Sequence, residues 1–180
     1  MTLEILSPGP FTTIQDLGRP GWGSVGVPPA GAADAPALRL ANLLVGNSEG
    51  AAGLEMTLAG SQISFSADAW VALAGSRFVA ALGDDPVPHA AAFLVRAGQT
   101  LSIGRTLEGA HAVLAVRGGF DVTPCSVVAP RSSPAASVAS MGGRCTVGID
   151  SRPARSAVVH AREPSASGFC PPTPPRPSCA

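Results

Sequence analysis

The chain has 180 residues, of which 46% are hydrophobic and 13% charged, and its formal net charge is zero. A chain without a basic excess cannot neutralise a phosphate backbone, which excludes a general nucleic-acid-binding protein. No apolar run reaches the length of a membrane span, and the N-terminus lacks the basic and then apolar order of a secretory signal. We therefore expect a cytoplasmic protein without a membrane or nucleic-acid partner.

The first two thirds of the sequence indicate a mainly β fold. Alternation with period two places Leu54, Met56 and Leu58 on one face of a strand, and Ile63 and Phe65 continue the pattern in the next. Gly- and Pro-rich turns separate many short runs of this kind, a cadence typical of sandwiches and barrels. The expected strands cover residues 3–6, 11–17, 53–60, 62–67, 70–74, 77–82, 92–96, 101–103 and 110–117.

One short helix is predicted between the second and third strands, in the stretch DAPALRLANLLVGN. Asp34 is a suitable N-cap, Pro36 fits the first turn, and Gly46 follows the last apolar residue, where helices commonly end. Leu38 and Val45 share one face with Ala41. We expect that face to cover an open end or side of the β-structure.

The densest polar stretch is TTIQDLGRPGWGSVGVPPAGAAD, in which glycines and prolines fix the backbone around several functional groups. Arg19 could grip a carboxylate through two parallel hydrogen bonds, Gln15 could donate or accept beside it, and Asp16 could orient Arg19 or handle a proton. The simpler interpretation is a loop in which an Asp–Arg pair ties a turn. Gln15, Asp16 and Arg19 are the candidate substrate-binding residues; no catalytic residue and no metal site is predicted.

The chain resembles the biotin-dependent carboxyltransferase family, also called allophanate hydrolase subunit 2 or the C subunit of 5-oxoprolinase. The resemblance lies in LSPGPFTTIQDLGRPGWGSVGVPPAGAADAPALRLANLLVGN, in GLEMTLAG and in LAVRGGFDV, and it covers roughly residues 3–124. Ala33 departs from the family, which usually has Met there. The matching residues are Thr13, Gln15, Asp16, Gly18, Arg19, Pro20, Gly21, Asp34, Arg39, Asn42, Asn47 and Glu55.

The resemblance implies a cyclophilin-like β-barrel that works with a partner of the allophanate hydrolase subunit 1 type, which is similar to the B subunit of 5-oxoprolinase. It implies a part in carboxyl transfer from biotin or in ATP-dependent opening of 5-oxoproline, with 5-oxoproline or a urea derivative as substrate. We expect no cofactor on this chain itself, because the resemblance places biotin on a partner carrier and ATP in the complex. The alternative is a non-catalytic β-barrel that regulates a partner protein.

The remaining segment, residues 125–180, differs in composition. It contains six of the twelve arginines against two acidic residues, a net charge of +4, with all four cysteines and nine of the eighteen prolines. The cysteines include no C-x-x-C pair, so their spacing does not support a zinc site. Such a segment is expected to be a disordered Pro/Arg-rich tail, and PPTPPRP within it could bind an SH3-like groove.

A change of reading frame offers another explanation for this tail. When the third base of each codon is joined to the first two of the next, residues 124–131 permit V-L-G-S-R-S-T, which the family typically has after its GGFDV segment. Residues 140–145 likewise permit D-G-R-A-L. The sequence therefore predicts an out-of-frame translation after about residue 124, and a truncated subunit that is inactive alone.

Overall fold

The computed structural model describes residues 1–18, 20–21, 23–26, 28–120 and 145–148 of the chain. The described part is mainly β with one α-helix, as expected. Its elements in chain order are β1 (Thr2–Ser7), β2 (Thr12–Gln15), the 3-10 turn η1 (Gly23–Val25), α1 (Ala35–Val45), β3 (Gly53–Thr57), β4 (Gln62–Phe65), β5 (Ala69–Leu82), β6 (Asp85–Pro86), β7 (Ala92–Val95), β8 (Thr100–Val116) and β9 (Cys145–Gly148).

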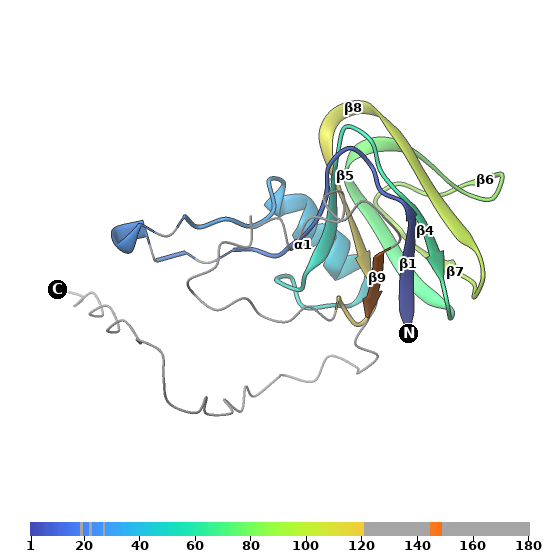
Figure 1. The fold of residues 1–180 in the computed structure, drawn as a ribbon, viewed down its shortest axis with the longest axis horizontal. Coiled ribbons are helices and arrows are strands. Elements are labelled where there is room, and N and C mark those ends of the chain that lie inside the picture. Colours follow the sequence, from blue (N-terminus) through green and yellow to red (C-terminus); the bar gives the residue numbers. More distant parts are fainter. Residues whose placement is uncertain (19, 22, 27, 121–144, 149–180) are drawn as a thin grey trace.

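The strands form one strongly curled sheet, a half-barrel, whose main path is β2-β3-β8-β4-β1-β9 (Figure 1). Strand β8 organises it: residues 101–116 pair with β5, while its other edge pairs with β3 through residues 111–114 and with β4 through residues 100–102. The concave side of the sheet encloses the main hydrophobic core, which includes Leu3, Phe65, Leu101 and Leu114. This curled half-barrel is the form that the expected cyclophilin-like β-barrel takes in the described residues.

The sequence analysis divided two long strands into four short ones, and this division is wrong. Residues 70–74 and 77–82 belong to the single strand β5, and residues 101–103 and 110–117 belong largely to β8. Both gaps in the prediction, residues 75–76 and 104–109, contain glycine. Gly75 (φ 100°) and Gly109 (φ 74°) instead bend continuous strands, and the β5–β8 register shifts between Gly75 and Arg77.

Leu58 also departs from the predicted alternation. Leu54 and Met56 are buried in the main core, but Leu58 is 57% exposed. Strand β3 ends at Thr57, and Leu58 adopts φ 63°, with the N–H of Ala59 bonded to the carbonyl of Thr57. The chain therefore reverses at Leu58, so the period-two pattern no longer determines where its side chain points.

Helix α1 forms as predicted and packs against the sheet (Figure 1). The carboxylate of Asp34 accepts a hydrogen bond from the N–H of Ala37 (2.9 Å), and Gly46 ends the helix in the left-handed conformation (φ 78°). Leu38, Ala41 and Val45 pack with Ala72, Ala74, Val113 and Ala115 in a second core on the convex side. No helix in the described part of the chain is long and apolar enough to cross a membrane.

Strand β9 lies within the segment that was expected to be disordered. It pairs antiparallel with β1, with Val147 opposite Leu3 and Cys145 opposite Ile5. Residues 145–148 therefore form a strand and not a disordered segment. They lie at the edge of the sheet beside the N-terminus (Figure 1). The expectation for the other positions of residues 125–180 falls outside the described residues.

Candidate functional site

A cluster of three polar residues lies on the convex face of the sheet, near the start of α1. Thr13 on β2 is directly opposite Glu55 on β3, and Gln15 follows on the same face, opposite Gly53. Thr13 and Glu55 are each only 5% exposed. The Oε1 atom of Glu55 accepts a hydrogen bond from the N–H of Asp34 (3.1 Å), which ties the cluster to the helix cap.

Gln15 has the most unusual environment of the three. Its Nε2 donates to Thr13 Oγ1 at 3.2 Å, whereas its Oε1 is buried and accepts no hydrogen bond from any described residue. Leaving a buried acceptor without a donor costs about 1–3 kcal/mol. An amide held in this way can accept an N–H or O–H from a bound molecule, so Gln15 is the best-placed binding group of the cluster.

The two ends of the polar loop that follows β2 lie close together and are held by hydrogen bonds. The Oδ1 atom of Asp16 accepts from the N–H of Gly18 (2.8 Å), and its carbonyl accepts from the N–H of Ala32 (2.8 Å). Gly18 adopts φ 77°, and a Cβ there would lie 2.5 Å from the carbonyl oxygens of Pro29 and Ala30. Only glycine allows the two ends of the loop to approach so closely.

The structure describes two of the three predicted substrate-binding residues, and these two have different surroundings. Gln15 points into the buried cluster, and Asp16 uses one carboxylate oxygen to accept from the N–H of Gly18. Arg19 lies outside the described residues. Glu55 is among the residues that match the family pattern, but no individual role was predicted for it. In the structure the helix covers its face of β3, and its side chain is buried.

Other residues of the family pattern fasten the helix to the sheet. Asn42 is completely buried, and its Nδ2 donates to the carbonyl of Ala51 at 2.7 Å. Asn47 donates to Asn42 Oδ1 (3.0 Å) and to the carbonyl of Val116 (2.8 Å), while its own Oδ1 accepts from the N–H of Gly118 (2.9 Å). These two amides are therefore structural: they lock the end of α1 to the end of β8.

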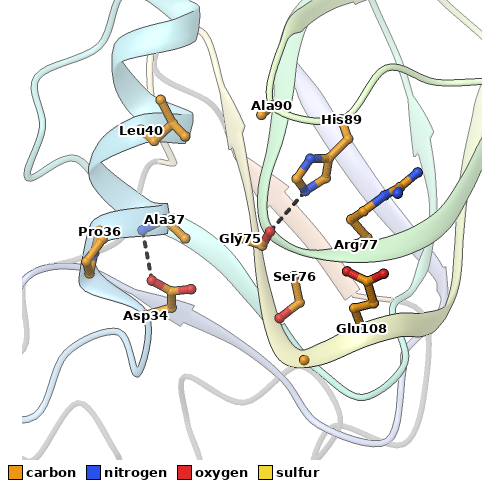
Figure 2. Close-up of a pocket in the computed structure, with 11 residues that line it drawn as sticks. Asp34, Pro36, Ala37, Leu40, Gly75, Ser76, Arg77, His89, Ala90 and Glu108 are labelled. Atoms are coloured by element: carbon orange, nitrogen blue, oxygen red, sulfur yellow. Dashed lines mark hydrogen bonds between the residues drawn. The ribbon is translucent and has the colours of Figure 1, made fainter.

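An open pocket of about 520 Å³ lies on the other side of Asp34, between the first turn of α1 and the bend of β5 (Figure 2). Figure 2 shows Asp34 and Leu40 on the helix side, and His89, Arg77 and Glu108 on the sheet side. The Nε2 atom of His89 lies 3.0 Å from the carbonyl oxygen of Gly75. Among the residues that the structure describes, no three His, Cys, Asp or Glu side chains are grouped to hold a metal ion.

Comparison with known proteins identifies the family to which the chain belongs. The model of the carboxyltransferase domain, subdomain A and B, matches residues 25–144, and the chain belongs to this family. It is 44% identical to the 5-oxoprolinase C subunit of Escherichia coli (strain K12) over 122 residues, which are 68% of this chain and 39% of that protein. It is 42% identical to urea amidolyase of Lachancea kluyveri over 120 residues, 66% of this chain and 7% of that protein.

Solved structures show the same relationship. The urea amidolyase of K. lactis aligns with a TM-score of 0.67 and 37% identity over 68% of this chain and 8% of that one. The protein TTHA0988 aligns with a TM-score of 0.74 and 32% identity over 91% of this chain and 34% of that one. The chain spans 39% and 46% of the length of two 5-oxoprolinase C subunits, those of E. coli and Haemophilus influenzae.

Proposed function

We propose that the chain is part of a carboxyltransferase-type subunit in an enzyme complex that acts on a small amide or ureido substrate. The similarity to the 5-oxoprolinase C subunit and to urea amidolyase, each over about two thirds of the chain, carries this proposal. The substrate is 5-oxoproline or a urea derivative, and both contain an N–H group next to a carbonyl. The partner is a protein of the allophanate hydrolase subunit 1 type.

Within this complex, Gln15, Asp16 and Arg19 are the proposed substrate contacts. The buried, unpartnered Oε1 of Gln15 supports the first of these, since an amide or ureido N–H would supply the missing donor. Asp16 contributes less, because its Oδ1 is bound to the N–H of Gly18. Glu55 joins the proposal as a neighbour on the same face, fixed by the N–H of Asp34.

The cofactors of the reaction belong to the partners in this proposal. The open pocket beside α1 has the carboxylates of Asp34 and Glu108 and the single guanidinium of Arg77, a balance that disfavours the phosphates of ATP. The stretch GRPGWG also lacks the Lys-Ser/Thr ending of a phosphate-binding P-loop. Neither feature fits ATP, and in this proposal ATP binds a partner subunit and biotin is attached to a carrier protein.

Turnover by the assembled complex tests this function and distinguishes its substrates. The frame-restored chain is mixed with its partner subunits and ATP, and hydrolysis of ATP is followed with 5-oxoproline or with urea. We expect one of the two substrates to stimulate turnover, while the chain as it stands supports none. A stable complex that turns over neither substrate would favour the non-catalytic regulator instead.

The proposed change of reading frame has its own test, the coding DNA around codon 124. We expect the shifted frame to spell V-L-G-S-R-S-T from residue 124 and D-G-R-A-L from residue 140. The family match continues to residue 144, beyond the proposed change, and this observation weighs against it. If the shifted codons spell other residues, the frame change and the truncation derived from it are both rejected.

A further inference from the structure

The open pocket beside α1 is separate from the cluster of Thr13, Gln15 and Glu55, and the proposed function gives it no role. Its volume of about 520 Å³ lies within the range of small-molecule sites. Four parts of the fold line it: the first turns of α1, the bend of β5 at Gly75, the loop before β7 and the bend of β8 at Gly109. The pocket is therefore an open hollow to which four separate segments of the chain contribute.

The backbone around this pocket is held in an uncommon conformation. Gly75 and Gly109 have positive φ values of 100° and 74°, and Ala90, which is not a glycine, has φ 52°. The N–H of Ala90 donates to the carbonyl of Leu73 at 2.9 Å, which holds the loop against β5. Positive φ is unstrained for the two glycines, whereas at Ala90 it is strained, and strain of that kind concentrates at ligand-binding sites.

The charged groups of the pocket are available to a ligand. Arg77 and Glu108 are directly opposite each other on β5 and β8, both are exposed, and neither takes part in an ion pair with a described residue. Asp34 uses Oδ1 to accept from the N–H of Ala37, and no described residue donates to its Oδ2. The pocket thus offers two carboxylates and one guanidinium.

The helix end and the histidine determine where each charge of a ligand would bind. Pro36 has no N–H, and the N–H of Ala37 is already bonded to Asp34, so the start of α1 is a poor anion site. His89 must carry a proton on Nε2 to donate to the carbonyl of Gly75, which leaves its Nδ1 as an acceptor when the ring is neutral. Arg77 is therefore the group in the pocket that suits a carboxylate.

We propose that this pocket binds a small aliphatic amino acid as its zwitterion. The carboxylate of the ligand pairs with Arg77, and its ammonium group pairs with Glu108, which lies directly opposite Arg77 on β8. The aliphatic side chain extends into the pocket toward the helix side, where Leu40 is 43% exposed. This binding is independent of the enzyme activity proposed above, because it uses none of the residues assigned to substrate.

Ligand-observed NMR on the full chain tests the proposal with three related probes. L-norvaline carries both charged groups, pentanoate lacks the ammonium, and n-butylamine lacks the carboxylate. We expect L-norvaline to bind with a dissociation constant of about 1–10 mM and each fragment to bind at least about tenfold more weakly. No saturation transfer to L-norvaline, or equal binding of the three probes, would overturn the proposal.

Two variants test which residue binds each charged group of L-norvaline. Arg77→Gln should weaken the binding of L-norvaline about tenfold and leave the binding of n-butylamine unchanged. Glu108→Gln should weaken the binding of L-norvaline without weakening that of pentanoate. Arg105→Gln is the matched control, since Arg105 is an exposed arginine of β8 that does not line the pocket. Thermal unfolding checks that each variant folds. Equal weakening by Arg105→Gln would show non-specific attraction and reject the assigned site.

Discussion

Replacing Gly75 by alanine is expected to lower the free energy of unfolding by about 3 kcal/mol. A Cβ at this position would lie 2.7 Å from the carbonyl oxygen of His111 and 3.1 Å from Cβ of Ala37. Alanine would also have to adopt φ 100°, which costs about 1–2 kcal/mol in a left-handed conformation, and overpacking adds about 1–3 kcal/mol. The contact between α1 and the bend of β5 would open.

Gly98→Ala is the matched control for this effect. Gly98 also has a positive φ, 80°, but a Cβ there would meet nothing within 4 Å. It should therefore cost only the backbone term, about 1 kcal/mol. Urea denaturation of both variants measures the difference. Equal losses from the two substitutions would show that the close approach of α1 to Gly75 does not contribute to stability.

The second large effect is on activity, and it comes from Gln15→Leu in the assembled complex. Leucine has a similar size but cannot accept a hydrogen bond, so substrate turnover should fall by at least about tenfold if Gln15 Oε1 binds the substrate. The free energy of unfolding should change by no more than about 1 kcal/mol, because the loss of the Nε2 bond to Thr13 (3.2 Å) is offset by removal of a buried acceptor that has no donor among the described residues.

Gln62→Leu provides the control, since Gln62 is an exposed residue of β4 away from the cluster. Steady-state turnover and urea denaturation are measured on the same preparations. If Gln15→Leu unfolds the protein more easily while the folded fraction keeps full turnover, Gln15 is a structural residue of the loop. That outcome would remove it from the proposed substrate site.

The local rules of sequence reasoning were sufficient for the helix and most strands. Asp34, Pro36 and Gly46 bounded α1 because capping depends on neighbouring residues alone. The same rules failed at Gly75 and Gly109, where glycine bends a strand without ending it. Whether a glycine breaks or bends a strand depends on the partner strand, here β5 against β8, which the local sequence does not contain.

The candidate site was predicted only in part, for a related reason. The crowding of polar residues in TTIQD pointed to Gln15 and Asp16, and both lie where β2 meets the loop. The burial of Glu55 was not predicted, because alternation along β3 gives two faces but not which element covers each. Since α1 covers the second face, the carboxylate of Glu55 is buried beside Thr13 rather than exposed to water.

The most direct measurement of the central claim is substrate-dependent ATP hydrolysis by the partner subunits, with and without the frame-restored chain. The proposed function predicts that 5-oxoproline or urea stimulates hydrolysis only when the chain is present, and that Gln15→Leu lowers this stimulated rate. Equal stimulated rates in the presence and absence of the chain would contradict a part in the enzyme complex.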